Sequence, residues 1–227
     1  MIILLSRYIS NKDIDLGEKM SDEIIISNDP GISGGISIIY QNGKIEVYKI
    51  PVCNIVVNKK NKKVYDIDEI FNLLKKFKDK NVFYIQEKVG SHPGEGSVSS
   101  FGFGKSSGLT IGIAKGLGFE VCEISPSAWK KQFPELVTDG IKQKKEEIKK
   151  LRAFDKTLKD KGQKKENKKN IEKLGRQIKS EAKTAARELV SSLYPDISNK
   201  FRKKNTDGMA ESVLIALYGK NHIDELA

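Results

Sequence analysis

Three short apolar segments near the start of the chain, each bounded by turn-forming residues, restrict the fold most strongly. They are residues 23–28, 36–40 and 44–57. All three are rich in isoleucine, valine or tyrosine, as β-strands are. The first is stopped by Pro30-Gly31, and the second is separated from the third by Asn42-Gly43, the strongest short hairpin signal. The chain is therefore predicted to open with a three-stranded antiparallel meander, whose third strand bends at Pro51.

Helical and extended segments alternate after the meander. Apolar residues recur at helical spacing across residues 66–77, and a second helix is predicted over residues 109–117. Residues 81–86 and 119–124 have the composition of buried strands. Between them, the Gly/Ser-rich stretch 89–100 is expected to be a loop, of a length that is usually functional or mobile. The order β-β-β-α-β-α-β predicts an α/β fold.

The composition changes after these segments. Between residues 139 and 181, sixteen lysines and arginines stand against eight acids, which accounts for +8 of the net charge of +11. Two apolar stripes at helical spacing, with Gly162 between them, predict a basic helical hairpin. A solvated and partly disordered charged linker is the alternative for this composition. Tyr194-Pro195 ends the second helix, and a last helix is predicted from residue 206 to about residue 218.

Charge and cysteine content narrow the class of partner and the compartment. A net charge of +11 in 227 residues indicates a polyanionic partner, above all nucleic acid, and a lysine-rich solvated surface is the alternative. The two cysteines, Cys53 and Cys122, belong to no CxxC or Cys/His cluster, so neither a zinc site nor a disulfide framework is expected. No apolar stretch approaches the ~20 residues of a membrane span. We therefore expect no membrane contact and a location in the cytoplasm, in a host cell's soluble compartment or in an organelle.

Four acidic residues fall where the predicted elements place chemistry. Asp29 ends the first strand, Glu87 ends the fourth, and Asp207 and Glu211 lie four residues apart at the start of the last helix, hence on one face of it. Carboxylates that converge at strand ends repel each other unless cations neutralise them. Oxygen ligands alone favour Mg²⁺ or Mn²⁺, and two such ions could clamp the attacking and leaving oxygens of a phosphodiester.

Each acid also has a simpler interpretation. Asp29 in Asp-Pro-Gly could only form a turn, and Glu87 could be a surface charge that ends a strand. Asp207 could merely cap the last helix, and Glu211 could be a first-turn acid favoured by the helix dipole. Their joint order along the chain is what favours a shared metal site.

This ordered set of segments resembles the RuvC-like Holliday-junction resolvases, in particular their phage and viral branch, within the ribonuclease H-like superfamily. The matching segments are residues 28–35 (NDPGISGG), 85–104 (IQEKVGSHPGEGSVSSFGFG), 125–131 (SPSAWKK) and 207–216 (DGMAESVLIA). Together they span most of residues 23–220. The final acid, Glu211, stands where bacterial members carry aspartate, its spacing from Asp207 differs by one residue, and the basic segment is longer than the usual link.

The resemblance implies a ribonuclease H-like fold: a mixed sheet, formed by a three-stranded antiparallel meander plus parallel strands, flanked by helices and carrying a basic helical insertion. The expected organisation is a tail over residues 1–22, a nuclease domain over 23–220 with the insertion at 139–181, and a C-terminal tail over 221–227. The resemblance also implies a homodimer, dependence on Mg²⁺ with Mn²⁺ as a substitute, no organic cofactor, and cleavage of four-way DNA junctions. Asp29, Glu87, Asp207 and Glu211 would be the catalytic and metal-binding acids.

The residues expected to contact DNA are Phe101, Phe103, Lys105, Lys130 and Lys183. The two phenylalanines stand among small residues, and a ring exposed there could stack on a base at the branch point. Packing of either ring in the core is the alternative.

Other functions stay open from the sequence. One is a less selective nuclease of the same fold that acts on flaps, forks or RNA–DNA hybrids. Another is a branched-DNA-binding protein without catalysis, against which the four retained acids argue, because unused buried carboxylates cost stability. An actin-like ATPase would need a second phosphate-binding glycine turn, and no convincing one is present.

Overall fold

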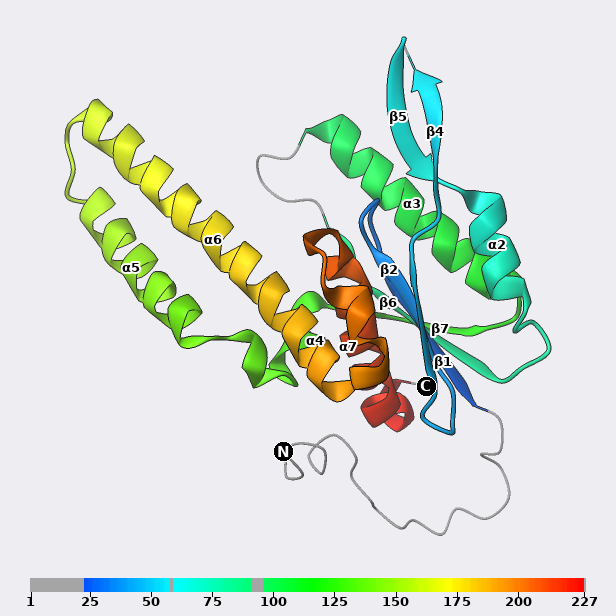
Figure 1. Ribbon diagram of the computed structural model, residues 1–227. Coiled ribbons are helices and arrows are strands. Elements are labelled where there is room, and N and C mark those ends of the chain that lie inside the picture. The colour runs from blue at the N-terminus through cyan, green and yellow to red at the C-terminus, as the bar shows by residue number, and fades with distance from the viewer. Residues whose placement is uncertain (1–22, 58, 91–95, 227) are drawn as a thin grey trace.

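The computed structural model describes residues 23–57, 59–90 and 96–226 (Figure 1). A five-stranded mixed sheet forms its centre, with the strand order β3-β2-β1-β6-β7, and β4 and β5 form a separate two-stranded ribbon. The strands are β1 (Ile24–Asp29), β2 (Gly35–Ile39), β3 (Ile45–Lys49), β4 (Val52–Val57), β5 (Lys60–Tyr65), β6 (Val82–Glu87) and β7 (Glu120–Ile124). Strands β1, β2 and β3 pair antiparallel, which confirms the predicted meander, and β6 and β7 continue the sheet in parallel with β1.

Helices and short 3-10 turns cover the sheet and extend from it. They are α2 (Ile67–Lys75), α3 (Ser97–Gly116), α4 (Pro126–Lys131), η1 (Pro134–Leu136), α5 (Asp139–Asp155), α6 (Lys161–Leu193), η2 (Pro195–Phe201), η3 (Lys204–Thr206) and α7 (Asp207–Leu226). Several begin at side-chain caps of the expected kind: Asp66 caps α2, Ser125 caps α4 and Asp160 caps α6.

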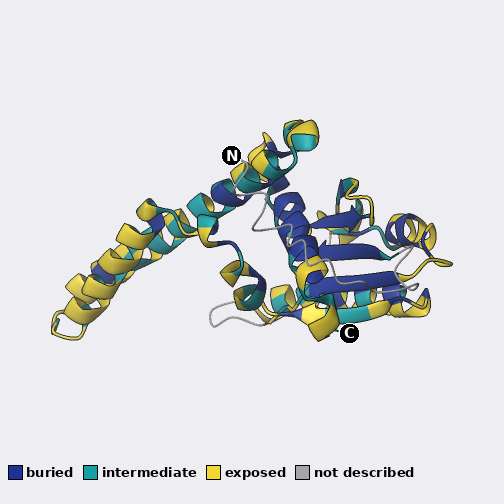
Figure 2. Ribbon diagram, turned by 90° about the horizontal axis from the view of Figure 1, so that it is seen from below, coloured by how far each residue is buried: buried dark blue, intermediate teal, exposed yellow. Residues whose placement is uncertain are grey.

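The sheet is buried on both faces, and its alternating residues divide between two apolar cores. In β1, Ile25 packs with α7 and the end of α6, whereas Ile24 and Ile26 pack with α2 and α3 on the opposite face. This division follows from the two-residue period of a strand, because successive side chains point to opposite sides. Figure 2 shows the buried centre of the molecule, which is formed by the central strands β1, β2 and β6 and by α7.

The order of the strands and the helices on both faces define a ribonuclease H-like mixed α/β fold, as the sequence predicted. The predicted basic helical insertion is present as α5 and α6. None of the helices in the described part of the chain is long and apolar enough to cross a bilayer. The expected tail over residues 1–22 lies outside the described residues.

Two predicted elements were wrong. The third strand does not run from residue 44 to 57: β3 ends at Lys49, and β4 leaves the sheet to pair with β5, which the sequence did not reveal because four of its six residues are lysine or asparagine. The loop expected over residues 89–100 is also too long, because α3 begins at Ser97. Of that loop, residues 91–95 lie outside the described residues. Phe101 and Phe103 therefore lie on a helix.

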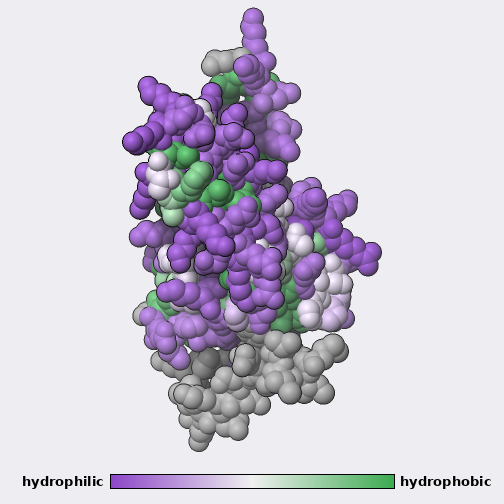
Figure 3. Space-filling view, turned by 90° about the vertical axis from the view of Figure 1, so that its left-hand side faces the viewer, coloured by the Kyte–Doolittle hydropathy of each residue, from purple (hydrophilic) through white to green (hydrophobic). Residues whose placement is uncertain are grey.

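Helices α5 and α6 form an antiparallel hairpin that extends away from the sheet (Figures 1 and 2). Buried Asn167 of α6 joins them, since its Nδ2 donates to the Leu151 carbonyl and to Oδ1 of Asp155, both at 3.0 Å. The turn between them ends at Asp160, so Gly162 lies inside α6 rather than between the helices. Most of the surface that faces the viewer in Figure 3 is hydrophilic, with small apolar patches between the polar side chains.

Candidate functional site

Two of the predicted acids are neighbours because their strands are neighbours. Parallel pairing aligns Asn28 of β1 with Gln86 of β6, so the next residues, Asp29 and Glu87, end adjacent strands at the same edge of the sheet. Asp29 is buried and Glu87 is half-buried. This edge is where open α/β sheets place their ligands.

The other two acids reach this edge through a close contact between glycines. Gly34 and Gly208 form a backbone bridge between the loop before β2 and the first turn of α7. A Cβ on Gly35 would lie 2.6 Å from the Gly208 carbonyl oxygen, and a Cβ on Gly208 would lie 2.8 Å from Oδ2 of Asp29. Only glycine allows this approach. It places Asp207 and Glu211, one helical turn apart, beside Asp29.

The four acids lie close enough to affect each other's charge. Burial raises the pKa of Asp29 well above its usual range, and the carboxylates of Glu211 and Glu87 raise it further. Burial also raises the pKa of Glu211; the nearby Lys130 lowers it, whereas Glu87 and Asp207 raise it. The ionised forms are therefore costly without an added cation.

Cations and donors already contact three of the four acids. Asp207 pairs with Arg187, and with Lys183 at 3.4 Å, while Lys130 lies 3.9 Å from Glu211. The indole Nε1 of Trp129 donates to Oε2 of Glu87 at 2.6 Å. These partners come from α4 and α6, so the site combines strands β1 and β6 with three helices.

The residues fit a divalent cation by chemistry. Among the described residues, no three His, Cys, Asp or Glu side chains stand close enough together to hold one as they are placed. Binding an ion would therefore require the carboxylates to turn toward it. The donor set consists of carboxylate oxygens, which suits Mg²⁺ or Mn²⁺. Burial, together with neighbouring carboxylates, raises the pKa of Asp29 and of Glu211, and a bound cation would offset this cost of ionisation.

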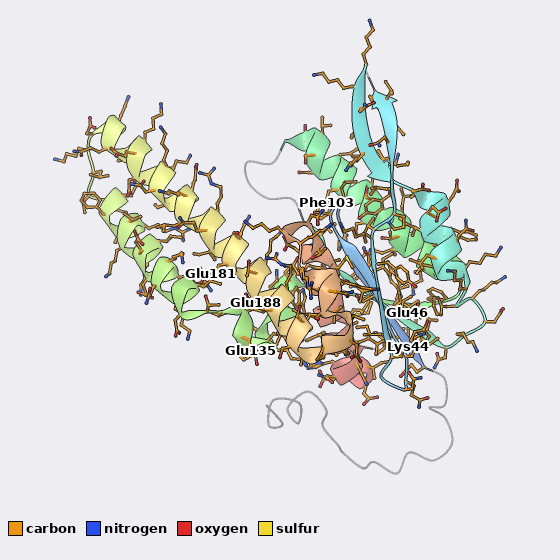
Figure 4. All side chains as sticks on the ribbon, in the orientation of Figure 1. Lys44, Glu46, Phe103, Glu135, Glu181 and Glu188 are labelled. Carbon is orange, nitrogen blue, oxygen red and sulfur yellow. The ribbon has the colours of Figure 1, made fainter. Side chains whose placement is uncertain are left out.

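Not all of the residues expected to contact DNA lie at the acids. Lys130 and Lys183 lie at the acids, as described above, and Phe103 packs beside the loop that follows Asp29, its Cε2 3.7 Å from where a Cβ on Gly31 would be (Figure 4). Phe101 lies at the start of the second turn of α3 and is 75% exposed. Lys105 lines a groove on the outer face of α3 instead, with Phe71 of α2.

Three residues at the site were not singled out from the sequence. Trp129 and Arg187 contact predicted acids, and Tyr65 accepts a 2.5 Å hydrogen bond from the Gly31 amide, in the loop after Asp29. Burial raises the pKa of Tyr65 to about 12, with a contribution from Asp29. The sequence contained a signal for Arg187 alone. Arg187 lies four residues after Lys183, so both fall on the same face of a helix.

A buried polar network fixes α3 against the strand ends. Thr110 Oγ1 and Asn28 Nδ2 each donate to Gln86 Oε1 at 2.7 Å, and Gln86 Nε2 donates to Ser107 Oγ at 2.7 Å. Asn28 and Gln86 directly precede Asp29 and Glu87. The network therefore holds the backbone from which the two acids project.

Comparisons with known proteins give distant structural similarity. The chain is similar to RuvC of T. thermophilus in complex with a Holliday junction substrate, with a TM-score of 0.43 and 10% identity over 89% of this chain and 96% of that chain. For the Thermus thermophilus RuvC structure, the TM-score is 0.40 and the identity 12%, with the same coverage. No family model and no curated protein sequence matches.

Proposed function

We propose that the protein is a Mg²⁺-dependent, structure-selective DNA endonuclease that cleaves four-way junctions by phosphodiester hydrolysis. The observation that carries the proposal is the convergence of Asp29, Glu87, Asp207 and Glu211 at one edge of the sheet. Lysines and an arginine border these acids, and the chain as a whole carries a charge of +11. An acidic centre within a basic surface suits a metal-assisted reaction on a polyanion.

In this proposal each group of residues has its own part. The four carboxylates would hold the metal, which when bound supplies Lewis-acid activation of water and neutralises charge on the scissile phosphate. Trp129 fixes the orientation of Glu87 through its hydrogen bond. Lys130 and Lys183, both partly exposed, are placed to attract the phosphate and hold it beside the acids.

The decisive experiment measures cleavage of matched labelled substrates. A synthetic four-way junction, a linear duplex, a flap, a fork and an RNA–DNA hybrid are incubated with and without Mg²⁺. The proposal expects Mg²⁺-dependent cleavage of the junction above the others, and none by Asp29→Asn. Equal cleavage of all substrates would favour the less selective nuclease, and binding without cleavage would favour a non-catalytic junction-binding protein.

We also propose a homodimer, since two symmetric strands of a junction require two sites. The outer face of α3 supports this partner. Gly104, Gly108, Gly112 and Gly116 follow one another at four-residue intervals there, and a Cβ on any of them would meet no atom within 4 Å. Partly exposed Phe71 and Leu109 line the same groove. Light scattering of the purified chain measures its mass, and a monomer at working concentration would contradict the proposal.

A further inference from the structure

The ribbon of β4 and β5 projects from the main sheet as a separate arm (Figure 1). Its six paired residues in each strand, from Val52↔Tyr65 to Val57↔Lys60, make it about 20 Å long at the usual rise of a strand. It packs on the core at its base, where Tyr65 is buried, and its outer half is exposed on both strands. A hairpin this exposed contributes little to the core.

The ribbon leaves the molecule at the same edge as the acids. Lys49, at the end of β3, pairs with Gly35, and Gly35 pairs with Asp29. Strand β4 begins three residues after Lys49. At the base of the ribbon, the Tyr65 hydroxyl accepts the hydrogen bond from the Gly31 amide, two residues after Asp29. The ribbon is therefore attached to the loop that directly follows a predicted catalytic acid.

The charge of the ribbon is entirely positive. Lys59, Lys60, Lys62 and Lys63 are all exposed, and no acid occurs between Val52 and Tyr65. Apolar side chains accompany them: Ile55 and Val57 pair across the ribbon with Lys62 and Lys60, and Val56 is 72% exposed. Such a surface matches a partner that is both a polyanion and partly apolar, as the sugars and base edges of DNA are.

The turn at the tip keeps a lysine where glycine would fit better. Lys59 has a φ of 61°, and it is the one non-glycine residue with positive φ in the described part of the chain. Two-residue hairpin turns need this conformation and usually place glycine or asparagine there, because a Cβ makes it costly. A charge is thus held at the tip in an unfavourable conformation, which is typical of functional positions.

We propose that the β4–β5 ribbon binds the double-helical arm of a DNA substrate next to the acidic site, with its four lysines on phosphates. The major groove, about 12 Å wide, admits a two-stranded ribbon of this kind. The inference rests on the proposed function, because it takes DNA as the partner. It adds the surface that positions the duplex beside Asp29.

The test compares two fourfold variants that remove the same charge. One replaces Lys59, Lys60, Lys62 and Lys63 with glutamine. The matched control replaces Lys75, Lys76, Lys78 and Lys80, which are also exposed but lie before β6, at the opposite edge of the sheet. Binding to a labelled duplex and a labelled four-way junction is measured without divalent metal over a range of salt concentrations. The slope of log K against log salt is negative, and it should become shallower by about 2 to 4 in the ribbon variant, at ~0.9 for each phosphate that is no longer bound. It should stay unchanged in the control.

A single variant separates binding from folding. Lys59→Gly relieves the turn, so its melting temperature should equal or exceed that of the wild type, while its DNA affinity falls and its salt slope drops by about 1. An unchanged slope in the fourfold ribbon variant, or an equal fall in the control, would overturn the proposal. Cleavage in Mg²⁺ is measured separately. If the wild-type chain binds DNA through the ribbon but cuts no substrate, the proposed nuclease function is wrong and the role of the ribbon in binding stands.

Discussion

The indole Nε1 of Trp129 donates a 2.6 Å hydrogen bond to Oε2 of Glu87, across 42 residues of sequence. Trp129 is fully buried, and its ring packs edge-on against Phe133. The acid at the end of β6 is therefore oriented by a rigid side chain in the core rather than by solvent. Partners of this kind fix the geometry of a carboxylate ligand without touching the substrate themselves.

Trp129→Phe should lower Mg²⁺-dependent cleavage by about 10- to 100-fold, the range found when such partners of metal ligands are removed. Glu87 would keep its charge but lose its fixed orientation, so junction binding should persist. Phe133→Leu is the control, because it disturbs the same core without removing the hydrogen bond. If both variants lose cleavage in proportion to their melting temperatures, Trp129 has only a packing role.

Gly208→Ala should unfold the site, because the new Cβ would approach Oδ2 of Asp29 and the backbone of Gly34. We expect a loss of stability of about 1–3 kcal/mol, the usual cost of overpacking, together with loss of cleavage. Gly175→Ala in α6 is matched in chemistry but opens onto free space, so it should gain about 0.5–1 kcal/mol. Thermal unfolding of both variants measures the contrast, and equal effects would contradict the glycine contact.

Neutral replacements of the four acids should abolish cleavage yet spare DNA binding. Asp29→Asn, Glu87→Gln, Asp207→Asn and Glu211→Gln each remove one oxygen ligand, whereas the basic surface that holds phosphates stays in place. Cleavage assays and binding titrations on the same preparations separate the two effects. A variant with near-normal Mg²⁺-dependent turnover would remove its residue from the proposed site.

Two of these variants should change stability in opposite directions when metal is chelated. The folded-state pKa of Asp29 is raised above its unfolded value, so folding favours its protonated form and stability rises as pH falls. Asp29→Asn should therefore raise the melting temperature at neutral pH and flatten its dependence on pH. Asp207→Asn should lower it, because Arg187, which is only 11% exposed, would lose its partner. A lower melting temperature in both variants would contradict this account of Asp29.

Local patterns predicted the centre of the fold well. The meander followed from Asn42-Gly43 and from isoleucine-rich runs bounded by turn residues, and the parallel strands from short apolar runs. The misses share a cause. Strand β5 is mostly lysine and asparagine, and α3 contains five glycines and several serines, so local propensity argued against both elements. Tertiary packing overrides propensity in α3, because Ser107, Thr110 and Ala114 bury one face of that helix.

The site was predictable only in part, for a physical reason. Acids at strand ends can be found along a sequence because strand direction determines which edge they share. The partners of those acids cannot, since Trp129 and Arg187 reach them through contacts between distant elements. The charge of residues 139–181 and its helical hairpin were both predictable from the sequence, but the Asn167 contact that joins the two helices is made only in the fold.

Neutralising one groove of that hairpin should weaken DNA binding through electrostatics alone. Lys145, Lys149, Arg152 and Lys156 line a groove along α5 with Ile148. Replacing all four with glutamine should flatten the salt dependence of binding by up to about 0.9 for each phosphate that the hairpin no longer binds, for duplex and junction alike. An unchanged slope would show that this charge is a passive solvated surface. A fourfold glutamine change at the opposite edge of the sheet, before β6, serves again as the control.

The structure separates the two phenylalanines that the sequence treated alike. Phe101, near the start of α3, is 75% exposed, whereas Phe103 is partly buried and lies beside Gly31. Stacking an exposed ring on an unpaired base contributes roughly 1–3 kcal/mol, and a junction offers such base faces where a duplex does not. Phe101→Ala should therefore reduce junction cleavage while its melting temperature and its binding to nicked duplex stay unchanged. Phe103→Ala should lower the melting temperature, because it removes packing over the loop after Asp29. Normal junction cleavage by Phe101→Ala would contradict the prediction that this ring stacks on a base at the branch point.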